Sequence, residues 1–504
     1  MTKSARALTN FISGGAGYLI PMAINLWSMP YVFNKLGEEA YGIQVLGNVI
    51  IGYFMAIDMG IDIPIIKRVA ETDASGLFQE QSDFLQATAK IYFFIGLSGC
   101  VLILISTPLM INWFSMSDSM LEEGKVVFYL SGIGFLGSIF SIWGKAVYSG
   151  LHRYDISNGI NITSSIVGIL LGLLLIHSGY GVIGFFSARV SGFIVSSLVY
   201  VHLVSKRIIK FNLNHYFEKA VWNSIKSQTG YGFLLRMSGL IFSRIDQVLI
   251  ASWIGVESVA VYSIPILIVT TLSGLVASST HFLFPAASAL KVNTTKQEIE
   301  AFFVQSIRLV GVLCTLSFLP FIIWGKWFIS LWISPSMAAQ CGDLMFYLAI
   351  SFYLTASITI GLNAFLAGLG NIKLITVGNL TKSLGLFIGF LFAIKPFGLK
   401  GASFVYLVAN IIDIVYMIWI IEKYFNMKFY SLFSQVYLKL IILAIALGSA
   451  MFLFSNKLHT WFGLISALFL FGIAFVSGAL LLGLFSKREK DLVIGIITKS
   501  FSNS

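Results

Sequence analysis

One stretch of the chain decides its fold class: residues 180–204 read YGVIGFFSARVSGFIVSSLVYVHLV, and Arg189 is their single residue charged at neutral pH. About 20 apolar residues in helical form cross the hydrocarbon core of a bilayer, and a strand of a membrane barrel needs about half as many. Backbone polar groups inside a bilayer must pair within the protein. A run of this length therefore predicts a transmembrane helix.

The same pattern recurs along all 504 residues, of which 57% are hydrophobic and 11% charged, with a mean hydropathy of +0.88. A soluble protein carries about 25% charged residues, so the composition excludes an ordinary soluble domain. Apolar runs lie at 11–33, 41–63, 87–111, 126–148, 156–177, 180–204, 229–251, 259–283, 299–323, 344–366, 374–394, 400–421, 436–455 and 461–485. The sequence predicts an all-α polytopic membrane protein with about 14 transmembrane helices.

Basic residues set the predicted orientation of these helices. With the N-terminus inside, twenty of the 33 lysines and arginines fall in cytoplasmic segments and six on the opposite side. This asymmetry predicts that both termini lie in the cytoplasm. The net charge of +11 is thus a topology signal, and no nucleic-acid partner is expected.

The chain also resembles itself when it is displaced along its own sequence so that Gly37 falls on Gly255, a displacement that we call the repeat shift. The repeat shift also matches Gly150 with Gly368, Asn161 with Asn379 and, after one residue of slippage, Gly181 with Gly398. An even number of helices in each half predicts two parallel six-helix repeats about an axis normal to the membrane, with a cavity between them. Two C-terminal helices lie outside the duplication.

This organisation predicts four segments. They are a six-helix lobe at 1–206, a cytoplasmic linker at 207–228, a second six-helix lobe at 229–424, and two further helices with a tail at 425–504. Within the linker, Leu213, Phe217 and Val221 follow one another at a spacing of one helical turn among basic residues. That pattern predicts an amphipathic helix on anionic membrane lipids.

Seven basic residues fall inside the predicted spans, where a lysine or arginine at the bilayer centre costs on the order of 3 kcal/mol. Lys90 and Lys145 lie near the cytoplasmic ends of their spans, and we expect them to reach the membrane surface. The deepest cations are Arg189, Arg236 and Arg244, which are predicted to line a substrate cavity. Arg308 and Lys382 are intermediate in depth and are weaker candidates for that cavity.

Four acids accompany these cations: Asp58, Asp62, Asp246 and Asp413. Asp58 and Asp62 are expected one turn apart on the second helix, and any of the four is a candidate for balancing charge or exchanging a coupling ion. Seven cations against four anions leave the interior positive. The sequence therefore favours a solute with a compact anionic group such as phosphate or pyrophosphate, whose oxygens match the planar donors of arginine.

No catalytic residue, cofactor or metal is expected. The chain has no GxxxxGK[ST] or HExxH sequence, and its three cysteines and six histidines show no ligand spacing. A polymerase or ligase acting on lipid-linked sugars would need a long outer loop with catalytic groups. The longest predicted outer loop, 324–343, has only Lys326 and Asp343 as charges.

Two short segments resemble a known family. The sequence AIDMGI at 56–61, followed by KRVAE at 67–71, and GLHRY at 150–154, with Asn158 and Asn161, resemble segments of bacterial O-antigen repeat-unit flippases. These belong to the multidrug/oligosaccharidyl-lipid/polysaccharide exporter superfamily. The resemblance implies a V-shaped two-lobed bundle in the bacterial inner membrane. It also implies alternating-access transfer of an undecaprenyl-pyrophosphate-linked oligosaccharide to the periplasmic leaflet, for polysaccharide or lipopolysaccharide biosynthesis with other polysaccharide-assembly proteins.

Two alternatives on the same fold remain open. The first is a flippase for the lipid-linked peptidoglycan precursor, although the first helix has Asn25 and Leu26 and no arginine in its deep part. The second is a multidrug cation antiporter, which would favour an acidic cavity over the positive interior seen here.

Overall fold

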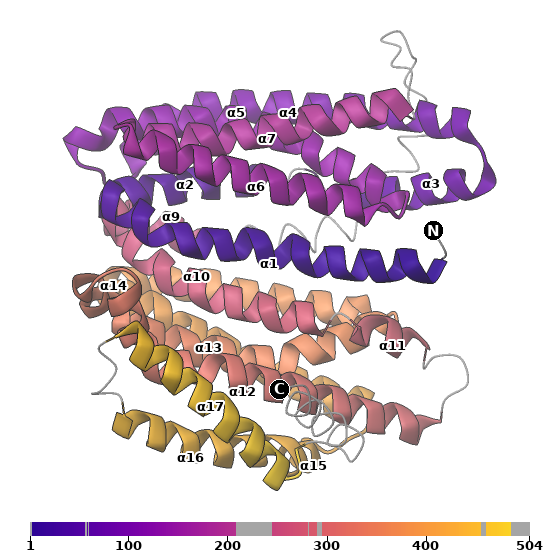
Figure 1. Ribbon diagram of the computed structural model, residues 1–504, viewed down its shortest axis with the longest axis vertical. Helices are drawn as coiled ribbons and strands as arrows, with labels where there is room; N and C mark the ends of the chain where they lie inside the picture. Colours follow the sequence, from indigo (N-terminus) through magenta and orange to yellow (C-terminus); the bar gives the residue numbers. More distant parts are fainter. Residues whose placement is uncertain are drawn as a thin grey trace, which may run out of the picture. The chain divides into compact units, whose positions relative to one another are not determined.

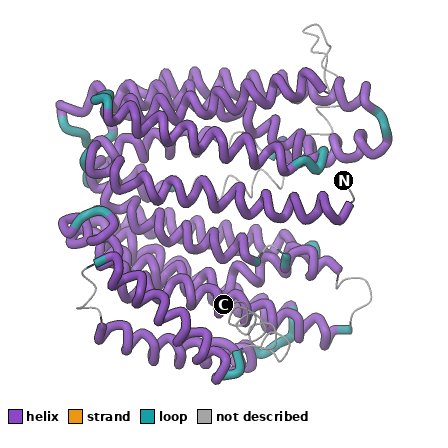
Figure 2. The backbone as a smooth tube through the Cα atoms, in the orientation of Figure 1, coloured by secondary structure: helices purple, strands orange, loops and turns teal. Residues whose placement is uncertain are grey.

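The computed structural model describes residues 3–55, 58, 60–207, 244–280, 282–289, 295–454 and 460–484. Throughout these ranges the regular elements are helices, and no strand occurs (Figure 2). Ten of the helices in these ranges are long and apolar enough to cross a bilayer. The prediction of an all-α polytopic membrane protein is confirmed.

The chain divides into two compact units. Unit 1 comprises Met1–Ser263 with Phe390–Gly398, and unit 2 comprises Ile264–Gly389 with Leu399–Ser504. The helices of unit 1 are α1 (Lys3–Leu36), α2 (Glu38–Met55), α3 (Asp62–Ser75), α4 (Phe78–Trp113), α5 (Leu121–Gly150), α6 (Tyr154–His177), α7 (Gly181–Arg207), α9 (Ile245–Trp253) and the start of α10 (Val256–Ser279) (Figure 1). A short 3₁₀ helix at Asp118–Met120 leads into α5.

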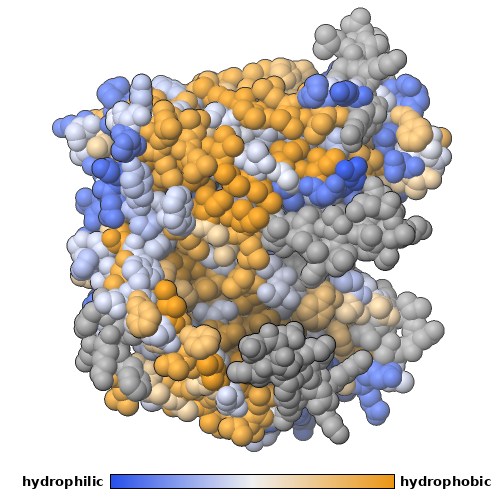
Figure 3. Space-filling model, viewed as in Figure 1, coloured by the Kyte–Doolittle hydropathy of each residue, from blue (hydrophilic) through white to orange (hydrophobic). Residues whose placement is uncertain are grey.

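Helix α5 is the centre of unit 1. It packs against α4 and α7, while α6 packs against α7 and α1. Phe128, Phe135 and Trp143 of α5 are fully buried, and the Trp143 indole N–H donates to Thr88 Oγ1 of α4 at 3.1 Å. On the face shown in Figure 3, hydrophobic side chains cover the middle of the unit 1 helices and hydrophilic ones gather at their ends. This is the surface that a bilayer requires.

Unit 2 contains the rest of α10 and seven further helices. They are α11 (Leu283–Ala289), α12 (Lys296–Trp332), α13 (Pro335–Gly368), α14 (Ile372–Tyr424), α15 (Phe429–Leu432), α16 (Leu438–Phe454) and α17 (Trp461–Leu481), with a π-helical turn at Phe433–Tyr437. The segment Phe390–Gly398 of α14 belongs to unit 1. Helix α12 begins at a capping box of Thr295 and Glu298. It packs against α13, α16 and α17.

Helix α14 is a hairpin of two antiparallel arms. Gly398, with φ 60° and ψ −143°, interrupts the helix in a backbone region open essentially to glycine alone. Across the turn, a Cβ at Gly378 would lie 2.9 Å from Tyr416 Cε1, and the Tyr416 hydroxyl donates to the Leu374 carbonyl at 3.0 Å. These contacts centre on Gly398, and the two arms match the separate spans predicted at 374–394 and 400–421.

Helix boundaries repeat under the repeat shift. Helices α2 and α6 begin at Glu38 and Tyr154, and their counterparts α10 and α14 begin at the two positions that the repeat shift assigns to them. Gly181 and Gly398, paired by one residue of slippage, have φ values of 56° and 60°.

Close contacts within each unit repeat as well. A Cβ at Gly150 would meet the Ile66 carbonyl oxygen and Val69 Cβ, both at 2.8 Å. A Cβ at Gly368 would meet the Phe284 carbonyl oxygen and Ala287 Cβ, both at 2.7 Å. The repeat shift places each residue of the first set on its counterpart in the second. This equivalent packing at two helix ends supports the predicted duplication.

Candidate functional site

A cavity of about 280 Å³ lies inside unit 1. Its wall is built by α5, α6 and α7, with Asn25 of α1 and Met55 of α2. Helix α7 contributes Phe185, Arg189, Gly192, Phe193, Ser196 and Tyr200. These positions recur every three or four residues and therefore share one face of the helix.

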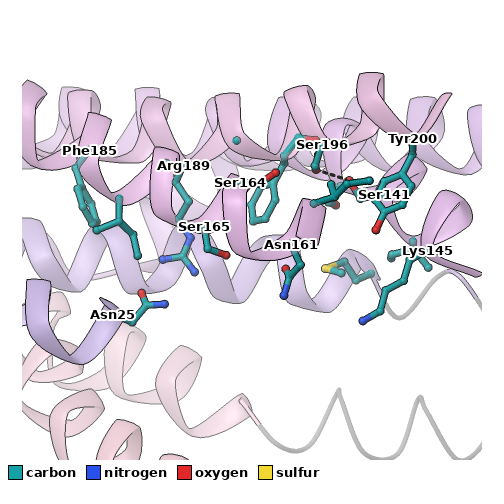
Figure 4. A pocket seen from close by; sticks show the side chains of 18 residues that line it. Asn25, Ser141, Lys145, Asn161, Ser164, Ser165, Phe185, Arg189, Ser196 and Tyr200 are labelled. Atoms are coloured by element: carbon teal, nitrogen blue, oxygen red, sulfur yellow. Dashed lines mark hydrogen bonds between the residues drawn. The ribbon is translucent and has the colours of Figure 1, made fainter. Parts of the chain in front are cut away.

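Arg189 extends from α7 into this cavity (Figure 4). Ser165 of α6 lies beside its guanidinium group, and Asn25 of α1 faces it from the opposite wall. No aspartate or glutamate is among the residues that line the cavity. Within the part of the chain that the structure describes, Arg189 forms no ion pair, and Arg244 is close enough to repel it electrostatically. A half-buried arginine without a carboxylate partner attracts an anion.

Hydroxyl groups line the middle of the cavity. The Ser141 hydroxyl of α5 shares hydrogen bonds with Ser196 at 2.6 Å and Ser197 at 2.9 Å on α7. Tyr200 donates its hydroxyl to the Ser157 carbonyl at 3.3 Å. Lys145 of α5 lies at the end opposite Arg189 (Figure 4). The cavity therefore has a cation at each end and neutral hydrogen-bonding groups between them.

The remaining charges predicted for unit 1 occupy different surroundings. Arg236 lies outside the described residues, as does the linker after Arg207. Arg244 is exposed and immediately precedes α9. Asp246 is buried in the first turn of α9, where Oδ2 accepts a hydrogen bond from the Tyr262 hydroxyl at 2.9 Å and Oδ1 accepts one from the Gln247 N–H at 2.9 Å. Its carboxylate is thus tied to the helix terminus and to α10.

In unit 2 two of the predicted residues pair with each other. Lys382 Nζ and Asp413 Oδ2 lie 3.7 Å apart across the two arms of α14, with side chains 24% and 4% exposed. Arg308 is half-buried on α12. The charge of Lys382 is therefore balanced within its own helical hairpin.

Asp58 and Asp62 do not share a helix, contrary to the prediction that they lie one turn apart on the second helix. Helix α2 ends at Met55, Asp58 is in a 3₁₀ turn, and Asp62 is the first residue of α3. Gly60 has φ 77°, a left-handed conformation that ends a helix. Pro64 then fits in the first turn of α3, where its missing N–H has no helical partner to lose.

Comparison with known proteins assigns the chain to a family. Residues 7–291 match the family of polysaccharide biosynthesis proteins. The chain belongs to this family. The predicted resemblance to repeat-unit flippases is confirmed, since a candidate O-antigen transporter of Shigella flexneri is 21% identical over 415 residues, covering 81% of this chain and 96% of that protein.

Solved structures agree on the fold of this polysaccharide biosynthesis family member. The lipid II flippase MurJ in an inward closed conformation has a TM-score of 0.68 at 14% identity, covering 94% of this chain and 100% of MurJ. An inward-facing multidrug resistance MATE family transporter of the MOP superfamily has a TM-score of 0.63 at 15% identity, covering 82% and 95% of the two chains. The protein is a multi-pass membrane protein of this fold.

Sequence reasoning did not assign Lys145 to the cavity of this family member. Its distance from the helix end favoured a side chain directed to the membrane surface. The signal available was its register: Ser138, Ser141 and Lys145 are three and four residues apart on an otherwise apolar helix, which places them on one polar face. Among the described residues, no group of three or more His, Cys, Asp or Glu side chains is placed to hold a metal ion.

Proposed function

We propose that the protein is a flippase that moves an undecaprenyl-pyrophosphate-linked oligosaccharide repeat unit from the cytoplasmic to the periplasmic leaflet by alternating access. The observation that carries the proposal is the position of Arg189, a cation without a carboxylate partner in a cavity of a transmembrane unit. The similarity of the chain to a candidate O-antigen transporter, over 96% of that protein's length, supports the same class of substrate.

In this proposal Arg189 binds the pyrophosphate. A guanidinium group offers several N–H donors in one plane, and charge-assisted hydrogen bonds to phosphate are about twice as strong as neutral ones. The neighbouring hydroxyl and amide groups of Ser165 and Asn25 are suited to solvate the remaining oxygens.

The other predicted charges keep subordinate roles. Arg244 adds positive potential near Arg189, and Arg236, Arg308 and Lys382 remain further candidates for contact with the anion. Asp58, Asp62, Asp246 and Asp413 remain candidates for balancing charge as the empty carrier returns.

The proposed location is the inner membrane with both termini in the cytoplasm. Reporter fusions after residue 215 should be cytoplasmic, and fusions after residue 457 should be periplasmic, as the distribution of basic residues requires. The reverse result would overturn the orientation and the direction of transport with it.

The energy for export comes from gradients or from consumption of the product outside, since the sequence has no nucleotide-binding motif. A headgroup with about two negative charges gains on the order of 4 to 5 kcal/mol per 100 mV on moving outward across an inside-negative membrane. Transport into vesicles with the potential and ion gradients imposed separately tests this. Turnover driven by a sodium or proton gradient, with no response to potential, would replace electrophoretic export by ion antiport.

Complementation tests the proposed substrate. In a strain lacking its own repeat-unit flippase, the wild-type protein should restore surface polysaccharide and prevent lipid-linked repeat units from accumulating on the inner leaflet. The same protein should fail to support growth of a strain depleted of its lipid II flippase. Rescue of the second strain alone would transfer the proposal to the peptidoglycan precursor, the function named for the structural neighbour MurJ.

A further inference from the structure

Lys145 is the second cation of the unit 1 cavity. It lies five residues before the end of α5 at Gly150, about 7 to 8 Å from that end at 1.5 Å per residue. A lysine so placed is able to extend to the membrane surface, yet its side chain lines the same cavity as Arg189 (Figure 4). Lys145 is exposed, and its charge is available to a ligand that enters the cavity.

Contacts between α5 and α7 fix the depth of Lys145 relative to Arg189. Gly144 packs directly on Tyr200, since a Cβ at Gly144 would overlap that side chain. Lys145 thus lies at the level of Tyr200, eleven residues beyond Arg189 on α7. That spacing corresponds to about 16 Å along the helix axis, roughly half of the 30 Å hydrocarbon core. The backbone positions of the two cations are thus separated by more than the length of one pyrophosphate group.

The wall between the two cations is neutral and polar. Asn161, Ser164 and Ser165 come from α6, and Ser141 and Ser196 come from α5 and α7 (Figure 4). These groups provide hydrogen bonds to phosphate oxygens or sugar hydroxyls. No acid on the cavity wall opposes an anion that moves along it.

We infer that Lys145 and Arg189 are two successive anion-binding stations at different depths of one cavity. The inference rests on the proposed function and its orientation, in which the end of α5 faces the cytoplasm. The pyrophosphate first binds Lys145 near the inner end of the cavity and then passes along the neutral wall to Arg189. Two sites of moderate affinity suit transport, because an anion must enter easily and still be able to leave.

Transport kinetics test the inner station. In vesicles loaded with an undecaprenyl-pyrophosphate-linked repeat unit, Lys145→Gln should raise the substrate concentration for half-maximal rate by about tenfold, and Lys145→Arg should keep it within about twofold of wild type. The matched control is Lys90→Gln, because Lys90 is a lysine of the neighbouring helix α4 that does not line the cavity. It should leave the half-saturating concentration unchanged.

Binding of inorganic pyrophosphate to the purified protein gives a readout independent of transport. The wild type should bind one more pyrophosphate than Lys145→Gln and one more than Arg189→Gln, whereas Lys90→Gln should match the wild type. A merely structural role for Lys145 would change the melting temperature without removing one binding event.

The outcomes separate this inference from the proposed function. Unchanged stoichiometry and an unchanged half-saturating concentration in Lys145→Gln would overturn the two-station inference, while wild-type export would still support a flippase. Loss of one pyrophosphate site in Lys145→Gln, together with failure of the wild type to move the lipid-linked repeat unit, would retain the two stations and reject the proposed substrate.

Discussion

Unit 1 and unit 2 differ in whether the cations inside their helices have an acidic partner. In unit 1, Arg189 and Lys145 line a cavity whose wall has no acidic residue. In unit 2, Lys382 lies 3.7 Å from Asp413, which is only 4% exposed. The first arrangement leaves positive charge available to a ligand, and the second neutralises it locally.

The duplication allows this comparison position by position. The repeat shift aligns Ser164 with Lys382, and the same shift with its one residue of slippage aligns Ser196 with Asp413. Both serines belong to the cavity wall of unit 1. Two neutral hydroxyls in one repeat thus correspond to an ion pair in the other, so depth in the bilayer alone does not identify a binding cation. A cation is available to a ligand only if no carboxylate lies opposite it.

Charge reversal at Arg189 should produce the largest effect. Arg189→Glu should abolish export, and Arg189→Ala should lower the initial rate about 10- to 100-fold, because hydrogen bonds to charged groups contribute about 1.5 to 3 kcal/mol. Arg189→Lys should retain part of the activity, since the charge remains. Surface polysaccharide and vesicle transport are measured at equal protein levels, with Lys35→Glu at the exposed end of α1 as control. Normal export by Arg189→Glu would contradict the electrostatic basis of the site.

Substitutions in the ion pair of unit 2 should change the free energy of unfolding. Lys382→Ala or Asp413→Ala should each lower the free energy of unfolding by about 3 to 5 kcal/mol, because each leaves one charge buried without its partner. The double variant Lys382→Met with Asp413→Leu should recover most of that loss. Thermal unfolding in detergent measures all three. A double variant destabilised by about the sum of the two single variants would show that the pair is not coupled.

The turn of the α14 hairpin should tolerate a side chain poorly. Gly398→Ala should cost about 1 to 3 kcal/mol because of the backbone region that Gly398 occupies. Gly385→Ala is a matched control on the same helix, since a Cβ at either glycine has no neighbour within 4 Å. In the helix interior that change should stabilise by about 0.5 to 1 kcal/mol. The melting temperature should fall in Gly398→Ala and rise in Gly385→Ala. Equal shifts in the two variants would argue against strain at the turn.

The exposed ion pair between α13 and the same hairpin should have the smallest effect. Lys400 donates to Asp343 at 2.8 Å, but the two side chains are 68% and 61% exposed. Asp343→Asn should therefore change the free energy of unfolding by less than about 1 kcal/mol, with no effect at high salt. A loss as large as that of Asp413→Ala would remove the distinction between exposed and buried pairs.

Apolar runs were sufficient to predict most helices, because a bilayer excludes nearly every other structure. The repeat shift also anticipated the equivalent packing of Gly150 and Gly368. The break between Asp58 and Asp62 was missed, since the run 41–63 stays apolar across Gly60. A single glycine in an apolar run does not reveal whether its φ is positive.

Site residues were harder to predict than helices. The sequence shows how deep a residue lies in the bilayer, but it does not show which neighbouring helix its side chain faces. Depth alone selected Arg189, which the structure places in a cavity. The same criterion selected Lys382 without revealing its pairing with Asp413, which depends on how the arms of α14 fold together. It also set aside Lys145, which is exposed and lines the same cavity as Arg189.

The hairpin of α14 has a consequence for how the protein enters the membrane. A lysine that moves alone from the translocation channel into the centre of the bilayer costs about 2.5 to 3.5 kcal/mol, and Lys382 is synthesised before Asp413. At about 5 to 20 residues per second, the carboxylate follows the ammonium group by roughly two to six seconds. Stable integration of this segment therefore waits for the second arm, and the two arms enter the lipid together with the charge of Lys382 neutralised by Asp413.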